Sequence, residues 1–285
     1  MIPILFDGVV QGLQLALLAV GITMIYGLGG ILQLAHGQVA VMAAMVAALL
    51  IAAGVNAVLA SAAGILAVAL FSVAMDWSLL RPAYRYRGEE RLLLSLVLTL
   101  GLAFLVDGFL TFRYPEIALT LRLRTPSVVV GGITVRTASI AVSVLAAAAF
   151  TLLALFLVKT WLGRAVRSLM QNDVGAALCG INADRTRTFI VGLSGLLAGL
   201  AGIAQGLFSS VGPEMGSEFT ILALIVAVVG GVRSLTGTVT AGLLLGVVNA
   251  FASYLVGTYM TLILLLGVAL VTILVRPQGL LAYWA

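Results

Sequence analysis

The chain has 285 residues, of which 62% are hydrophobic and 9% are charged, and its mean hydropathy is +1.23. Such a composition has too little polar surface to cover a water-soluble globule, so it excludes a soluble domain and predicts an integral membrane protein. The net charge of +5 does not indicate a nucleic-acid partner, because the basic residues stand in loops between apolar runs, where they mark a membrane surface.

Residue types with metal or redox chemistry are scarce. A single cysteine, Cys179, excludes an internal disulfide, and a single histidine, His36, excludes a multi-histidine metal site. We therefore expect no metal site and no catalytic residue. No Lys or Arg precedes the first apolar run, so we expect that run to be retained as a span rather than cleaved as a signal.

Long uninterrupted apolar runs predict α-helices, because a helix satisfies its own backbone hydrogen bonds in lipid and crosses it with about 20 residues. We expect an all-α fold, a polytopic transmembrane bundle of eight or nine spans with broken helices, forming one domain over residues 1–285. Nine spans go with an outside N-terminus. The expected spans are residues 9–30, 34–54, 57–80, 92–112, 138–158, 188–211, 220–231, 240–256 and 259–275.

The first two spans are separated by a glycine-rich polar break, GLGGILQLAHGQ, which contains Gly30, His36 and Gly37. Irregular backbone at membrane depth is tolerated only where it is buried in protein or faces a cavity. His36 is the one side chain that naturally titrates near neutral pH. It either bonds a substrate or gate, or bonds a backbone carbonyl that the break leaves free.

The loops that follow suggest the orientation. Residues 81–91 are short and arginine-rich, so we place them in the cytoplasm. Residues 113–137 also contain four arginines, so charge alone does not decide the orientation. One span separates this loop from each basic neighbour, so it lies outside if residues 159–187 are cytoplasmic. The alternating stretch SVVVGGITV in the outer loop predicts a small hairpin. Asp76 and Asp107 fall near the ends of their spans, close to Arg81 and Arg113, so we expect both carboxylates at the membrane interface.

Residues 159–187 could not lie inside a bilayer, because seven charged residues stand among them. Apolar residues at helical spacing predict an amphipathic helix over residues 165–179. Gly180 suits the left-handed position after that helix, and Asn182 or Asp184 can cap the next one. Two interpretations remain: a helix that docks in a protein groove, or a helix that lies on lipid headgroups. The apolar stripe comprises Val166, Leu169, Met170, Ala177, Leu178 and Ile181.

The C-terminal third repeats the pattern of the first break. Gly230-Gly231 is followed by Thr236-Gly237, as Gly29-Gly30 is followed by His36-Gly37. Small-residue breaks in two halves of a chain indicate a transport pathway at a repeat interface, although glycines that only pack helices would give the same pattern. The candidate pathway residues are Tyr26, Gly30, His36, Gly37, Gly230, Gly231, Thr236 and Gly237.

Two further segments of the C-terminal third lie outside the expected spans. Glu214 and Glu218, in the predicted outer loop, either accept basic residues of a binding protein or are solvated. Arg276 fits a cytoplasmic C-terminus, and Tyr283 and Trp284 fit an interfacial anchor.

Four segments, YGLGGILQLAHGQ, GRAVRSLMQNDVGAALCGINADR, VVGGVRSLTGTVTAGLLLG and RPQGLL, together resemble the permease subunits of branched-chain amino acid ABC importers of the LivH type. The resemblance runs from about residue 8 to the C-terminus. It implies a multi-pass subunit of a bacterial or archaeal inner membrane. The implied partners are membrane lipid, a second homologous, LivM-like permease, two cytoplasmic ATPase subunits and a periplasmic substrate-binding protein.

The resemblance also implies that residues 163–182 form the cytoplasmic coupling loop. Such loops carry an acidic residue before an alanine pair and then a glycine. Here Gly175 precedes the pair and the acidic Asp173 stands two positions earlier, so the acidic position is shifted or lost. The candidate coupling residues are Gly163, Arg164, Arg167, Leu169, Asp173, Ala176, Ala177, Gly180 and Ile181.

The implied function is that of a transmembrane permease subunit of an ATP-driven ABC importer for branched-chain amino acids, forming half of the translocation pathway. The chain has no Walker A pattern, so we expect ATP and Mg²⁺ to bind the partner ATPases, with no cofactor in this chain. Other amino acids or amides such as urea stay open as substrates, as does a homo- or heterodimeric permease. A stand-alone secondary transporter or channel is the alternative class, and a membrane enzyme would need constellations that the sequence lacks.

Overall fold

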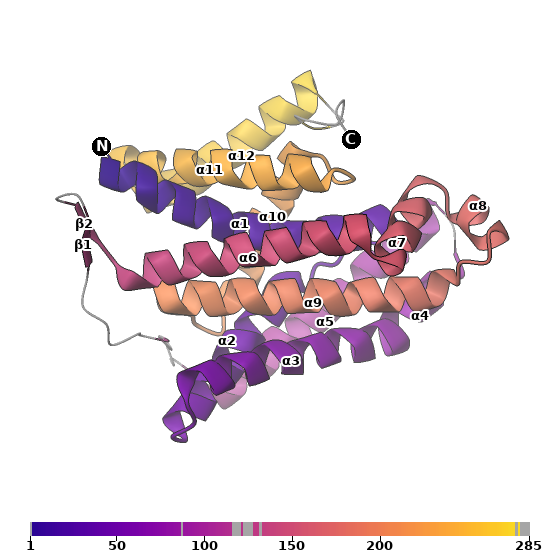
Figure 1. Ribbon diagram of the computed structural model, residues 1–285, viewed down its shortest axis with the longest axis horizontal. Coiled ribbons are helices and arrows are strands. Elements are labelled where there is room, and N and C mark those ends of the chain that lie inside the picture. Colours follow the sequence, from indigo (N-terminus) through magenta and orange to yellow (C-terminus); the bar gives the residue numbers. More distant parts are fainter. Residues whose placement is uncertain are drawn as a thin grey trace.

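The computed structural model describes residues 2–86, 88–115, 121, 128–130, 133–276 and 279. Its long helices lie side by side along the long axis of the molecule (Figure 1). The helices are α1 (Ile2–Gly29), α2 (His36–Ala52), α3 (Ala57–Met75), the π-helix η1 (Asp76–Leu80), α4 (Arg81–Ala83), α5 (Glu89–Arg113), α6 (Thr137–Lys159), α7 (Trp161–Gln171), α8 (Asp173–Leu178), α9 (Ala183–Phe208), α10 (Met215–Gly230), α11 (Leu235–Val256) and α12 (Thr258–Val275).

Six helical runs of the described chain are long and apolar enough to cross a membrane. Three shorter apolar helices, His36–Ala52, Met215–Gly230 and Met260–Val275, complete the set that the hydropathy predicted. This confirms a polytopic helical bundle. The span predicted over residues 57–80 continues through η1 and α4 to Ala83, and the first begins at Ile2 rather than residue 9.

The two ends of the bundle differ. α7 packs against one end of the bundle and α8 projects from that end, which we call the α8 end (Figure 1). At the other end, the hairpin end, the strands β1 (Val128–Val130) and β2 (Ile133–Val135) pair antiparallel, with Val128 opposite Val135, as the alternating sequence predicted. α1 begins at the hairpin end. Tyr283 and Trp284, the predicted interfacial anchor, lie outside the described residues.

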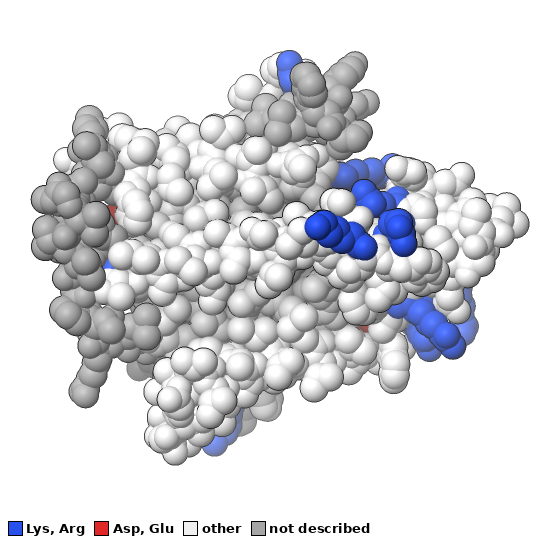
Figure 2. Space-filling model, viewed as in Figure 1, with Lys and Arg blue, Asp and Glu red and all other residues white. Residues whose placement is uncertain are grey.

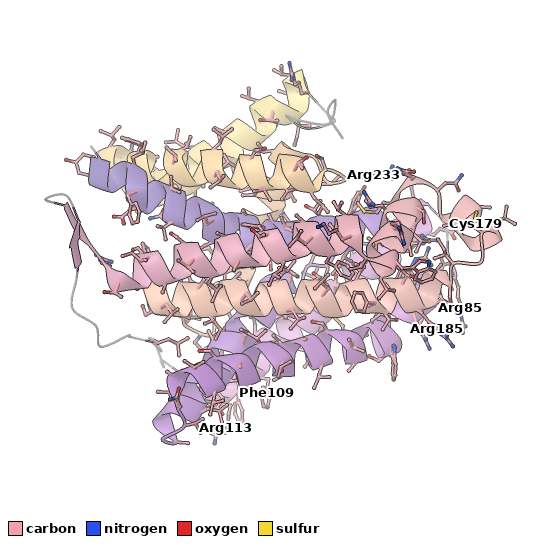
Figure 3. The ribbon with its side chains drawn as sticks, in the orientation of Figure 1. Arg85, Phe109, Arg113, Cys179, Arg185 and Arg233 are labelled. Carbon is pink, nitrogen blue, oxygen red and sulfur yellow. The ribbon has the colours of Figure 1, made fainter. Side chains whose placement is uncertain are left out.

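Basic side chains gather at the α8 end. On the face shown in Figure 2, most of the blue surface lies toward α7 and α8. Arg85, Arg185 and Arg233 are at this end, whereas Arg113 is at the other (Figure 3). The charge distribution therefore distinguishes the two membrane surfaces.

Glycines set the closest helix contacts. α1 packs on α11 through Gly8 and Gly12 on one side and Gly242 and Gly246 on the other, so that a Cβ at Gly12 would lie 2.8 Å from the Cα of Leu243. α9 packs on α2 and α3 in the same way, and a Cβ at Gly202 would collide with the carbonyl of Ala40. Small residues let helix backbones approach where no hydrophobic effect drives association, as the glycine-rich sixth span predicted.

Two short helices begin inside the bundle. After α1 the chain turns at Gly30, whose φ is +60°, and residues 31–35 return to the middle of α5, where Thr99 Oγ1 accepts from Leu34 N at 3.1 Å. α2 starts there. α10 starts beside it, because Thr220 Oγ1 accepts from Gly37 N at 2.9 Å and donates to the carbonyl of Leu34 at 3.1 Å.

The counterpart of the first break is therefore residues 209–214, between α9 and α10. The predicted second break, at Gly231, is instead a turn between α10 and α11, closed by a hydrogen bond from Ser234 N to the carbonyl of Gly231 at 2.8 Å. The resemblance in sequence arises because Gly231, with φ of +98°, needs glycine for a left-handed turn. The prediction of two corresponding breaks was right in kind but wrong in the position of the second.

Candidate functional site

The segment predicted as one helix over residues 165–179 is two helices, α7 and α8. Asn172 has an extended backbone, and its Oδ1 accepts from Gly175 N at 3.0 Å, which caps α8. Thr160 caps α7 and Asn182 caps α9 in the same manner. Gly180, with φ of +82°, follows α8 as predicted. The break follows from side-chain chemistry, because Asn competes for backbone donors within a helix and favours its start.

The apolar stripe of this segment does not form one face. Val166 and Leu169 are buried in the bundle, Leu169 being 3% exposed, and a Cβ on Gly27 would reach the methyl carbon of Met170. By contrast, Val174 is 58% and Leu178 is 85% exposed. Residues 161–171 thus anchor the segment to the bundle, and α8 presents an apolar surface outward.

The candidate coupling residues divide accordingly. Arg164, Arg167, Ala177 and Gly180 are exposed, Gly163, Leu169 and Ala176 are buried, and Ile181 is half-buried. The burial of Gly163 has a steric reason, because a Cβ there would collide with the carbonyls of Phe156 and Leu157. Leu169 therefore lies on the side of the segment that faces the bundle and away from any external partner.

The candidate pathway residues do not share one cavity. His36 is 1% exposed, and its ring fills the space that a Cβ on Gly21 of α1 would occupy. Gly37 packs on Gly216 and Thr220 at the start of α10. Gly230 and Gly237 pack on each other across the α10–α11 turn, whose Gly231 is buried and whose Thr236 is exposed, and Tyr26 is half-buried near the end of α1.

Gly30 does line a cavity, of about 340 Å³, at the α8 end. Arg91 spans part of its wall and donates to the carbonyl of Gly29 at 2.9 Å. Leu169, Asn172 and Arg233 also line it, so the first break and the α7–α8 segment face the same space.

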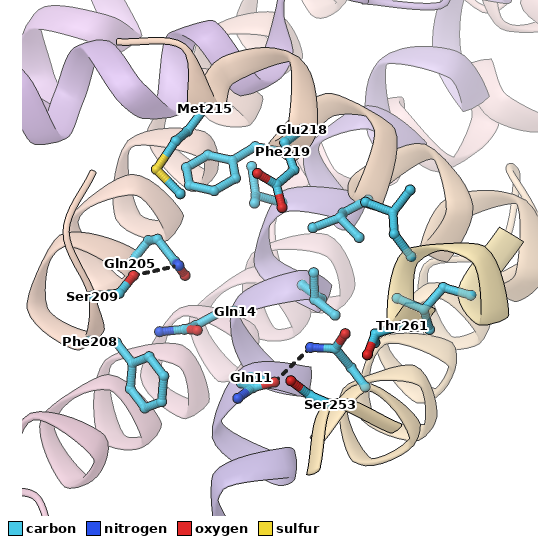
Figure 4. A pocket seen from close by; sticks show the side chains of 16 residues that line it. Gln11, Gln14, Gln205, Phe208, Ser209, Met215, Glu218, Phe219, Ser253 and Thr261 are labelled. Atoms are coloured by element: carbon cyan, nitrogen blue, oxygen red, sulfur yellow. Dashed lines mark hydrogen bonds between the residues drawn. The ribbon is translucent and has the colours of Figure 1, made fainter. Parts of the chain in front are cut away.

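A larger cavity, of about 470 Å³, lies in the half of the bundle toward the hairpin end, between α1, α9, α10, α11 and α12 (Figure 4). Sequence reasoning missed it, because its polar residues are single side chains, mostly amides and hydroxyls, that come from five separate parts of the chain. Asn249 Nδ2 donates to Gln11 Oε1 at 2.7 Å, and Gln205 Nε2 donates to Ser209 Oγ at 2.9 Å. The polar lining residues are Gln11, Gln14, Gln205, Ser209, Glu218, Asn249, Ser253 and Thr261.

The rest of that lining is apolar, with Leu15, Leu18, Phe208, Met215, Phe219, Leu222, Leu262 and Leu265. Of the described residues around the cavity, Glu218 alone carries a formal charge, and no arginine or lysine is among them. Such a surface suits a small solute that has both hydrogen-bonding groups and an apolar part.

A buried polar cluster connects α3 to α9 at the α8 end. Asp76, in η1, is fully buried and accepts hydrogen bonds from Thr188 Oγ1 at 2.5 Å and from the Tyr84 hydroxyl at 3.2 Å. The guanidinium of Arg187 lies 4.8 Å from the centroid of the Tyr84 ring. Burial, followed by the charge of Asp76, raises the pKa of the Tyr84 hydroxyl.

The two aspartates within spans have hydrogen-bond partners that the sequence did not predict, and their place at the membrane interface stays a prediction. Asp76 lies within its buried cluster, and Asp107 accepts from Gln38 Nε2 at 3.2 Å in the first turn of α2. Each carboxylate therefore accepts a hydrogen bond from a side chain of another helix, an arrangement typical of an ionisable residue within a span. In the described part of the chain, no three His, Cys, Asp or Glu side chains lie close enough to hold a metal ion.

Crossing helices, two half-helices that start inside the bundle and an amphiphilic cavity define a multi-pass membrane protein with the architecture of a transport subunit. A family model described as branched-chain amino acid transport system, permease component, matches residues 4–274. The chain therefore belongs to this family.

Known proteins support the assignment along the whole chain. The high-affinity branched-chain amino acid transport system permease proteins LivH of Salmonella typhimurium and BraD of Pseudomonas aeruginosa are 30% and 29% identical to it, each over 97% of this chain and 94% of the relative. The ribose import permease protein RbsC of Escherichia coli is 33% identical over 41% of this chain and 39% of its own length. In fold, the chain resembles PsaBC from Streptococcus pneumoniae, with a TM-score of 0.54 and 12% identity over 95% of this chain and 91% of that one.

Proposed function

We propose that the chain is the permease subunit of an ATP-driven importer of branched-chain amino acids in a bacterial inner membrane, where it forms half of the translocation pathway. A second homologous permease, two cytoplasmic ATPases and a periplasmic binding protein complete the importer. The family supports this assignment, since LivH and BraD are permease proteins of high-affinity branched-chain amino acid transport systems. The chain itself performs no catalysis, and ATP and Mg²⁺ bind the ATPases.

Orientation follows from charge. The α8 end, where Arg85, Arg185 and Arg233 lie, faces the cytoplasm, because positive residues remain on that side. The hairpin end and the 470 Å³ cavity then face the periplasm. A solute released by the binding protein enters that cavity first.

The observation that carries the coupling role is the division of the α7–α8 segment into a buried and an exposed side. Leu169 is 3% exposed and Leu178 is 85% exposed. A surface leucine on a projecting helix fits a groove on a partner protein. Because α7 packs on the bundle and joins α6 to α8, a displacement of α8 by a moving ATPase is carried to α6 and α9 as a rigid-body motion.

The proposed motion of α7 would change the shape of the cavity at the α8 end. Leu169 and Asn172 line this cavity together with Gly30, so movement of α7 changes the space next to the first break. The alternative, an α8 that lies on lipid headgroups beside a stand-alone transporter, leaves the same residues without a protein partner.

Site-specific photocrosslinking distinguishes these cases. The chain is co-expressed with its candidate ATPases, and a photoreactive residue replaces Leu178 in one variant and Leu169 in the other. We expect an ATPase adduct from position 178 and an adduct within the permease from position 169. An adduct with lipid from position 178, in a folded protein, would contradict the coupling role.

A further inference from the structure

Glu218 lines the larger cavity, although the sequence predicted it in an outer loop. It lies in the first turn of α10, and its carboxylate points into the 470 Å³ cavity (Figure 4). The neighbouring Glu214, the residue before α10, is exposed and does not line the cavity. The two glutamates that the sequence placed in one loop therefore have different surroundings: Glu218 lines the cavity and Glu214 does not.

The side-chain amides of the cavity can bind a negatively charged group, whereas Glu218 can bind a positively charged one. Gln14 Nε2 donates to the carbonyl of Ala204 at 3.2 Å, Gln205 Nε2 to Ser209 and Asn249 Nδ2 to Gln11. Each of these bonds uses one of the two hydrogens that a side-chain amide nitrogen carries. The second hydrogen of each amide and the hydroxyl of Ser253 can donate to a carboxylate, whereas the Thr261 hydroxyl already donates to the carbonyl of Gly257 at 2.9 Å.

We infer that this cavity binds the substrate as a zwitterion, with Glu218 pairing with the α-ammonium group, the amides donating hydrogen bonds to its carboxylate and the leucines and phenylalanines of the wall surrounding its aliphatic side chain. This inference rests on the proposed function and names a specificity-determining residue for it. An ammonium group makes a charge-assisted hydrogen bond to Glu218, which is stronger than the hydrogen bond that a neutral amide would make there. The cavity therefore favours solutes with an ammonium group over neutral amides of the same size.

The alternative role of Glu218 is contact with a basic residue of the binding protein. Kinetics separate the two roles. Loss of a docking contact raises KM for the loaded binding protein, whereas loss of a contact to the solute within the pathway lowers kcat after docking is complete.

The test measures ATP-driven import of L-leucine into proteoliposomes that contain the full complex, with the loaded binding protein as the varied component. Glu218→Gln keeps the shape of an exposed side chain, so the complex should assemble. We expect kcat to fall at least tenfold with KM unchanged, Glu218→Asp to recover part of kcat, and Glu214→Gln to match the wild type.

A wild-type kcat for Glu218→Gln, or a raised KM with kcat unchanged, would overturn the inference. If the wild-type complex imports no leucine with any of these components, the proposed function itself fails, and the Glu218 variants are not the reason. Failure of the two proposals is therefore distinguishable.

Discussion

Single glycines set the distance between α1 and α11. Gly12→Ala would place a Cβ 2.8 Å from the Cα of Leu243, so the helices must separate. We expect a loss of about 1–3 kcal/mol in the free energy of unfolding, which is the usual range for overpacking. The matched control is Gly101→Ala in α5, where nothing lies within 4 Å of the added carbon. Thermal unfolding in detergent should show a lower Tm for the first variant only; equal Tm values would contradict the packing role.

The hydrogen bond between Thr188 and Asp76 holds α9 to η1. Thr188→Val keeps the side-chain shape but leaves one oxygen of the buried Asp76 without its donor. We expect a loss of about 1–3 kcal/mol, the cost of an unsatisfied buried polar group. Thr151→Val is the control, because Thr151 is exposed and bonds only to the carbonyl of Ala147 in its own helix. A Thr188 variant as stable as the Thr151 variant would show that the cluster contributes nothing.

Gly37 is a residue whose role changes once its neighbours are known. The sequence placed it in a pathway, where a bulky substitution would stop transport and leave assembly intact. The structure packs it on the carbonyl of Gly216. We expect Gly37→Leu to abolish the folded protein, which size-exclusion chromatography would show as aggregate. A monodisperse Gly37→Leu permease that failed only in transport would favour the pathway role instead.

Local chemistry explains which single residues the sequence could predict. Gly180 and Asn182 act on their own backbone within a few residues, so their roles follow from residue type. The role of Asp76 depends on Thr188, which is 112 positions away. The sequence near Asp76 shows only a span-end aspartate with an arginine close by, so its bond to Thr188 could not be predicted from local chemistry.

At the scale of the elements, α7 and α8 each carry a leucine, and the two differ in exposure: Leu169 of α7 is buried and Leu178 of α8 is exposed. Leu178→Asp adds a charge to an exposed surface, so the permease should fold with an unchanged Tm but associate at least tenfold more weakly with its ATPases. Leu169→Asp buries a charge and should destabilise the permease itself. Pull-down and unfolding of both variants measure these effects. ATPase binding by a folded Leu178→Asp protein at the wild-type level would show that α8 is not the contact.

The half-helices show how far periodicity and glycine content can predict elements. The first break was predictable, because polar and glycine residues interrupt a run too long to be one span. The second was assigned to Gly231, because a tight turn and a break have the same glycine signature. The true counterpart, residues 209–214, is identified by the contact between Gly37 and Thr220, 183 positions apart.

At the scale of the whole molecule, the order of spans and the two membrane surfaces follow from hydropathy and charge. The cavity toward the hairpin end does not, since its amides come from helices at both ends of the chain and look like ordinary polar residues in each. The large cavity lies toward the hairpin end, whereas the first break and Asn172, the residue before α8, line a second cavity at the α8 end. In the proposed function, the first cavity receives the solute and an ATPase that moves α8 acts at the second.

The most direct test of the proposed importer function is to measure leucine uptake by proteoliposomes. These contain this chain, its partner permease and the two ATPases, with the binding protein added outside. We expect uptake against a gradient that requires ATP and every component, and that stops when the ATPases are omitted. Leucine uptake by this chain alone, without ATP or ATPases, would contradict the account and identify a stand-alone transporter.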